Sequence, residues 1–188
     1  LSAPGGIANE ETFARFNDSR AENPIGMDVT QQSYEFTSSS RNDFVILRYI
    51  VRNSTGGSIS SAYLGLYMDW DILVYSSNRG AWEPGDQMLW SCYNDGFTEN
   101  RYRGVAVLDG TTATAFTSST SLVSFPGGFT EEEKYNSLTN GFSTADNYRS
   151  TSADICQILA AGPFTLSAGA IDTIAFAILV GDSLSHVQ

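Results

Sequence analysis

The segment "DFVILRYIVRNS", residues 43–54, constrains the fold of this chain more than any other. Successive side chains of a β-strand point to opposite faces of its sheet. Large side chains occupy both faces of this segment: Val45, Leu47, Tyr49 and Val51 on one, and Phe44, Ile46, Arg48, Ile50 and Arg52 on the other. Two bulky faces are typical of a strand that lies inside a sheet, so we expect this strand to be central.

The same period of two recurs along most of the chain and predicts further strands. These lie at residues 27–37, where a slip in phase suggests a bulge, and at 62–72, 87–93, 102–110, 112–120 and 163–182. Their irregular spacing and the lack of βαβ alternation favour a mainly β fold, an antiparallel β-sandwich. A length of 188 residues fits a single domain over 1–188.

One short helix is expected to be inserted between the strands. In "FTEEEKYNSLTNG", Thr130 and Glu133 have the spacing of a capping box, three glutamates favour a helix N-terminus, and Gly141 fits its end. A further short helical turn is predicted in residues 154–163. Residues 1–25 are predicted to be irregular, with room for a short helix that turns Phe13 and Phe16 inward.

The charge of the chain argues against two classes of partner. There are 21 acidic and 10 basic residues, for a net charge of −11. Such a surface repels nucleic acid and anionic lipid, whereas it attracts cations or keeps an exported protein soluble. The longest apolar run, residues 174–180, is too short for a membrane span.

The residues needed for nucleophilic catalysis are scarce. The chain has one histidine, His186, the third residue from the end of the given sequence, and it has no G-x-S-x-G motif. We therefore expect no enzyme activity and no catalytic residue in this chain. Cys92 and Cys156 either form one disulfide or remain two buried thiols.

The stretch "YLGLYMDWDI", residues 63–72, contains the candidate metal ligands. Strand alternation turns Trp70 toward the core and puts Asp69 and Asp71 together on the opposite face. Two carboxylates at this spacing can hold one Ca²⁺ with oxygens from the turns that follow, where Asp86, Asn94 and Asp95 lie. The alternative is that both aspartates simply end the strand and bond nearby backbone amides.

Tyr63 and Tyr67 share the face of the two aspartates and are the candidate ligand-binding residues. Aromatic rings beside acidic groups can bind carbohydrate. Alternatively, a covering segment packs on the tyrosines, and the turn-rich stretch 76–101, with Trp82 and Trp90, is the expected cover.

Five segments together resemble a β-rich region that is appended to subtilisin-like (S8 family) serine peptidases and to other large secreted bacterial proteins. They are "PIGMDVTQQSYEF", "DFVILRYIVRNSTGGSISSAYLGLYMDWDI", "YRGVAVL", "EEEKYNSLTNG" and "AAGPFTLSAGAIDTIAFAILVGDSL". The resemblance implies a non-catalytic accessory module, secreted or at the cell surface, cut from a longer protein and partnered by the domains beside it. It carries over no catalytic residue. Binding of carbohydrate or cell-surface material, and a structural domain stabilised by Ca²⁺ alone, are the alternatives.

Overall fold

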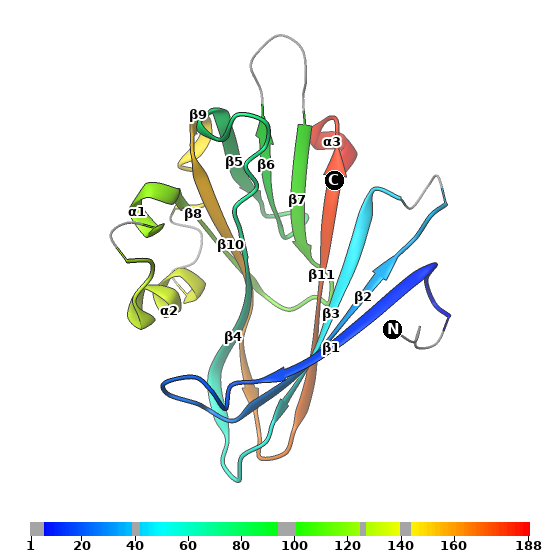
Figure 1. Cartoon of the computed structure of the whole chain (residues 1–188), viewed down its shortest axis with the longest axis vertical. Coiled ribbons are helices and arrows are strands. Elements are labelled where there is room, and N and C mark those ends of the chain that lie inside the picture. The colour runs from blue at the N-terminus through cyan, green and yellow to red at the C-terminus, as the bar shows by residue number, and fades with distance from the viewer. Residues whose placement is uncertain (1–5, 39–41, 94–100, 125–126, 140–143) are drawn as a thin grey trace.

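The structure, a computed structural model, describes residues 6–38, 42–93, 101–124, 127–139 and 144–188 and confirms the mainly β, antiparallel sandwich (Figure 1). The described strands are β1 (Glu10–Asn17), β2 (Met27–Glu35), β3 (Phe44–Asn53), β4 (Ile59–Met68), β5 (Asn78–Glu83), β6 (Met88–Tyr93), β7 (Arg101–Val107), β8 (Ala113–Ser119), β9 (Tyr148–Ala153), β10 (Ile155–Leu166) and β11 (Ile171–Gly181). They form two layers of unequal size.

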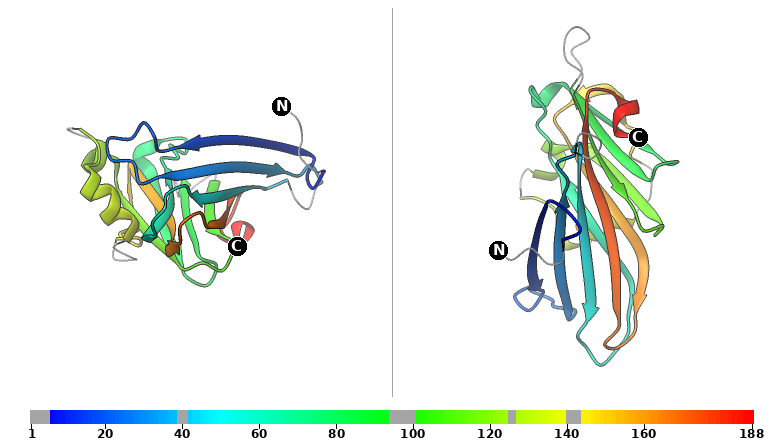
Figure 2. Two further views of the ribbon diagram at one scale, coloured as in Figure 1. Left: turned by 90° about the horizontal axis from the view of Figure 1, so that it is seen from below. Right: turned by 90° about the vertical axis from the view of Figure 1, so that its right-hand side faces the viewer.

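The larger sheet has the strand order β1-β2-β3-β11-β7-β6-β5-β9, and the smaller sheet has the order β4-β10-β8. Every pair of neighbours is antiparallel. The predicted central strand, β3, lies between β2 and β11, which confirms its place inside the larger sheet. β1 is a terminal strand of the larger sheet and stands at its outer edge in both views of Figure 2.

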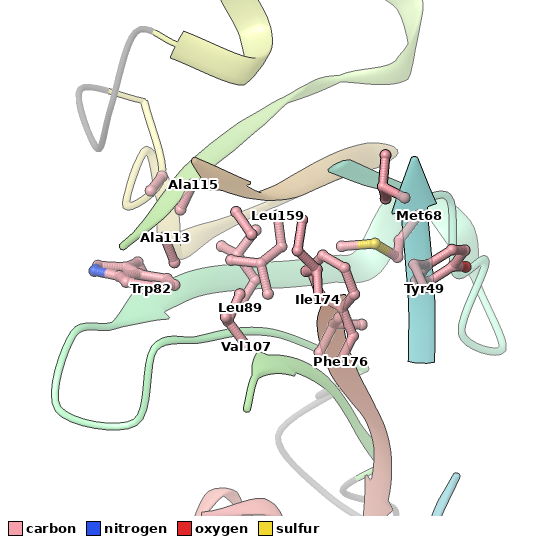
Figure 3. Close-up of a cluster of buried hydrophobic side chains, with 14 of the residues drawn as sticks. Tyr49, Met68, Trp82, Leu89, Val107, Ala113, Ala115, Leu159, Ile174 and Phe176 are labelled. Carbon is pink, nitrogen blue, oxygen red and sulfur yellow. The ribbon is translucent and has the colours of Figure 1, made fainter. Parts of the chain in front are cut away.

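The core lies between the two sheets. Leu159 of β10, Ile174 and Phe176 of β11, and Leu89 of β6 are almost fully buried there, with Trp82 of β5 at one end of the cluster (Figure 3). A second, smaller cluster lies on the other face of the larger sheet. Its buried members are Ala81, Met88, Trp90, Cys92, Ala106 and Val187.

The bulge predicted in residues 27–37 is absent from β2. β2 pairs with both neighbours without a shift in register, so the expected bulge is wrong. The phase slip has another cause: Val29 faces the core between the sheets, while Tyr34 is buried on the opposite face. A half-apolar strand with one large residue on each face needs no bulge.

Two segments predicted to contain helical turns are strands. Within residues 1–25, predicted to be irregular, Glu10–Asn17 forms β1, and Phe13 and Phe16 are exposed rather than turned inward. Residues 155–166 form β10, the middle strand of the smaller sheet. A short apolar run does not by itself distinguish a buried strand from a buried helix, and here strand pairing decides.

The predicted helix is present as α2 (Glu131–Thr139), and its capping box is formed. The backbone N–H of Thr130 donates to Glu133 Oε2 at 2.8 Å, and Glu133 N–H donates to Thr130 Oγ1 at 3.2 Å. Gly141, the expected stop, lies outside the described residues. The described parts of the chain also contain α1 (Thr120–Ser124), α3 (Leu184–Val187) and a 3₁₀ turn, η1 (Tyr75–Ser77). None of the described helices has the length and apolar character to cross a membrane.

Candidate functional site

Three aspartates gather at the end of the smaller sheet. Asp69 and Asp71 follow β4, and Asp154 lies between β9 and β10. One carboxylate oxygen from each of the three lies within 4.8 Å of the other two. The structure therefore brings the two predicted residues together and adds a third from a distant part of the sequence.

The pairing of β4 with β10 explains why Asp154 lies close to Asp69 and Asp71. β4 and β10 are antiparallel neighbours, with Met68 opposite Gln157. The residues that follow Met68 and those that precede Gln157 therefore lie at the same end of the smaller sheet. This brings Asp154 beside Asp69 and Asp71.

The predicted orientation of this stretch is confirmed in outline. Asp69 and Asp71 are exposed, and Trp70 is half-buried against the core. β4 ends at Met68, however, rather than at the predicted Ile72. Asp71 then adopts a φ of 41°, a left-handed conformation that is uncommon for residues other than glycine.

The electrostatics of the cluster disfavour three free carboxylates. The pKa of Asp69 is raised above its ordinary value, first by partial burial and then by the negative charges of Asp71 and Asp154. A cation between the three would relieve this repulsion. Carboxylate oxygens are the ligands that Ca²⁺ prefers, and its flexible coordination allows a surface site completed by water.

Of the other predicted oxygen donors, Asp86 does not join this group. Asp86 instead accepts a hydrogen bond from Gln188 Nε2 at 3.3 Å. Asn94 and Asp95 lie outside the described residues. Sequence analysis missed Asp154 because its proximity depends on the pairing of β4 with β10, which links residues more than 80 positions apart. A strand-pairing signal between the two segments would have been needed.

Tyr63 and Tyr67 face α2 and the loop before it. The ring of Tyr63 meets that of Tyr135 edge-on, with centroids 6.1 Å apart, and the ring of Tyr67 meets that of Phe129 in the same way at 6.4 Å. Tyr67 nevertheless keeps 50% of its surface exposed. The covering segment is therefore α2 with Phe129, and it covers the face only in part.

A pocket of about 360 Å³ lies beside Tyr67, between α2 and the smaller sheet. Gly65, Phe129, Leu138 and Ile158 line it together with Tyr67. Its polar lining residues are Ser137 and Lys134, the only lysine in the sequence, whose Nζ is 2.6 Å from Glu131 Oε1. Such a lining suits a flat, largely apolar ring with a polar edge.

The described part of the stretch 76–101 does not cover the tyrosines. Its described part forms β5 and β6, strands of the larger sheet. Trp82 lies in the core between the sheets, and Trp90 lies in the cluster on the other face. Each is 5% exposed, so neither offers a surface for ring stacking.

The two cysteines are free thiols, which decides between the two predicted states. Cys92 lies on β6 and Cys156 on β10, and both are buried. Burial raises the pKa of each thiol, so both behave as small apolar side chains rather than as nucleophiles.

His186 lies in α3, between two carboxylates. Its Nδ1 is 3.0 Å from Asp182 Oδ1, and its Nε2 is 3.3 Å from Asp43 Oδ2. These hydrogen bonds raise the pKa of the imidazole, the contact with Asp182 more than that with Asp43. His186 thus joins the helix after β11 to the residue that precedes β3.

Comparison with protein-family models and with curated proteins finds no match to this chain. The likeness to regions appended to subtilisin-like peptidases consequently rests on the five sequence segments alone.

Proposed function

We propose that this chain is a non-catalytic accessory β-sandwich module of a secreted multidomain protein, appended to a subtilisin-like serine peptidase. Its role is to pack against, orient or extend the catalytic domain. One observation carries the non-catalytic part: the only histidine of the sequence has both ring nitrogens engaged by carboxylates. A general base needs one free nitrogen directed at a nucleophile, so this geometry supports a structural role for His186.

Two experiments test this proposal: sequencing the gene that encodes the parent protein, and comparing the full-length parent protein with a form that lacks this chain. The parent should encode a subtilisin-like domain. Deleting residues 1–188 should leave hydrolysis of a small chromogenic peptide intact while shortening the thermal half-life of the peptidase. A parent with no peptidase domain, or hydrolysis by the isolated chain that is lost in His186→Gln, contradicts the proposal.

A second proposed role, stabilisation by Ca²⁺, is favoured by the convergence of Asp69, Asp71 and Asp154. A cation that binds only the folded state stabilises it, by about 3–4 kcal/mol when its concentration is several hundred times the dissociation constant. The measurement is the melting temperature of the chain in Ca²⁺ and in a chelator.

Two matched variants test whether Ca²⁺ acts at the three aspartates. Asp154→Asn should remove the Ca²⁺-dependent rise in melting temperature. Asp172→Asn should retain it, because Asp172 is exposed on β11 and bonds only the neighbouring Thr173 N–H among its described contacts. A melting temperature that Ca²⁺ does not change leaves the aspartates as residues that end a strand.

The third proposed role is recognition of carbohydrate or cell-surface material at Tyr67, supported by its half-exposed ring beside the apolar pocket. Binding to a panel of immobilised glycans should be lost in Tyr67→Ala. It should persist in Tyr75→Ala, which removes another exposed tyrosine outside the pocket. Equal binding by both variants rejects this site.

A further inference from the structure

One edge of the larger sheet, formed by β1, has no further strand beside it among the described residues. β1 has eight residues, more than the usual strand length of about five or six. It pairs with β2 over its full length without a bulge and contains no proline or lysine, although Glu10, Glu11 and Arg15 give it charge. Natural sheets usually protect their edges with prolines, bulges, short strands or charges, because an open edge pairs with other chains.

The side chains of β1 are also largely exposed. Phe13 is 43% exposed and Phe16 is 50% exposed, on opposite faces of the strand. The smaller sheet does not cover them, and no described strand pairs with β1 on its far side. We propose that two copies of this chain associate through β1, antiparallel, so that their larger sheets join into one continuous sheet.

The backbone groups available for this pairing can be identified. Asp18, which follows β1, donates its N–H to the carbonyl of Met27, its direct partner in the register with β2. Hydrogen-bonded and non-hydrogen-bonded pairs alternate along an antiparallel ladder. Glu11, Phe13 and Arg15 therefore point their N–H and C=O groups away from β2, toward the free edge.

Charge selects one register among those that match these groups. With Phe13 opposite the partner's Phe13, each Glu11 lies opposite the partner's Arg15, and all three residues lie on one face. A shift of two residues in either direction would set Phe13 against Arg15 or against Glu11 and would pair no opposite charges. A shift of four residues would set Arg15 against Arg15 or Glu11 against Glu11. Like charges directly opposite each other are unfavourable, and aromatic and opposite-charge pairs are favourable.

Glu11 keeps its carboxylate close to this edge. It is 4% exposed, and its Oε1 accepts hydrogen bonds from the backbone N–H groups of Ile7 and Ala8. Its other oxygen, Oε2, is buried and has no hydrogen-bond partner among the described residues. In the proposed register the positive charge of the partner's Arg15 lies directly across from Glu11 and offsets its negative charge through space, without a bond to Oε2.

Sedimentation equilibrium of the intact chain tests the association. The mass should rise with concentration from 20.4 kDa toward twice that value. Phe13→Pro removes an outward N–H without removing a bond to β2, and Arg15→Glu sets like charges opposite each other, so both variants should remain monomeric. Arg52→Glu makes the same charge change on the exposed surface of β3 and should still dimerise. Circular dichroism and melting of each variant confirm that it is folded.

Cysteine cross-linking tests the register. In the proposed dimer the two Phe13 Cα atoms lie about 5.5 Å apart, within disulfide range, so Phe13→Cys should cross-link on mild oxidation. The two Arg15 Cα atoms lie about 14 Å apart, so Arg15→Cys should not. The natural thiols, Cys92 and Cys156, are buried and do not compete. A wild-type chain that stays monomeric at every concentration overturns the proposal. So does a dimer that persists in Phe13→Pro and Arg15→Glu, or cross-linking at position 15 as strong as at position 13.

Discussion

Ser91 of β6 and Gln157 of β10 join the two sheets across the core through a hydrogen bond of 2.6 Å between their side-chain oxygens, Oγ and Oε1. Both residues are 1% exposed. The Gln157 amide nitrogen donates in turn to the carbonyl of Trp90 at 3.1 Å and to Thr117 Oγ1 at 3.3 Å. A buried amide with these partners fixes how the two sheets sit on each other.

Gln157→Met should destabilise the chain by about 2–3 kcal/mol, because it leaves the Ser91 hydroxyl and the Trp90 carbonyl buried without this partner. Urea unfolding followed by tryptophan fluorescence measures the change. Gln31→Met, at a half-buried position on β2, is the control and should change stability by less than about 0.5 kcal/mol. Equal effects of the two substitutions would show that the bridge contributes little.

Gly80→Ala should disrupt the same bridge. A Cβ at Gly80 would lie 2.7 Å from Gln157 Nε2 and 2.8 Å from the Trp90 carbonyl oxygen, which is backbone and cannot easily move. We expect a loss of about 2 kcal/mol in the free energy of unfolding. Gly85→Ala, whose Cβ would meet nothing within 4 Å, should be nearly neutral. The effects of Gly80→Ala and Gln157→Met should not add, since both act on one contact.

The His186 contacts predict a pH-dependent contribution to stability. The folded-state pKa of His186 is raised, so its contribution is complete below the ordinary histidine value of about 6.5 and is lost as the pH rises through the folded value. The pKa of Asp182 is lowered, chiefly by its hydrogen bond to His186, so its contribution is lost as the pH falls below the ordinary carboxyl range.

The difference in melting temperature between wild type and His186→Gln should therefore be largest between about pH 4.5 and 6. It should shrink on both sides of that window. Ser185→Ala, in the same short helix, is the control and should show no such window. A difference that does not vary with pH means that His186 acts through packing alone.

Asp69→Asn should have opposite effects with and without Ca²⁺. In a chelator at pH 7 it should raise stability by about 0.5 kcal/mol, a small figure because Asp69 is solvent-screened. The raised pKa of Asp69 means that this gain disappears as the pH falls through the folded-state value and the carboxyl protonates. With Ca²⁺ at saturation the variant should instead be less stable than wild type. Melting in both buffers at several pH values checks the prediction, and the same sign in both buffers would contradict it.

The sequence alone predicts those strands and the helix whose signals lie within the element itself. The bulky faces of β3 identify a central strand from twelve consecutive residues, and the capping box at Thr130 and Glu133 places the start of α2 correctly. β1 was not foreseen, because Phe13 and Phe16 are three apart and also fit a helix face. Only pairing with β2 makes the segment a strand.

The three-aspartate site was likewise predictable from the sequence only in part. Asp69 and Asp71 are close in sequence, so strand geometry alone predicts that they lie together. Asp154 joins them only through the pairing of β4 with β10. The cover over Tyr67 was misassigned for a related reason: the length of a connecting stretch does not show whether it will add strands to a sheet, as β5 and β6 do.

The unequal size of the two sheets sets a gradient of mutational tolerance across the molecule. Three strands cannot shield eight, so folding depends most on the half of the larger sheet around Phe176, which is fully buried, and least on the edge strand β1, where six of the eight residues are exposed. Ala14 and Phe16 of β1 are exposed, so substitutions at these positions are released from the constraints of core packing.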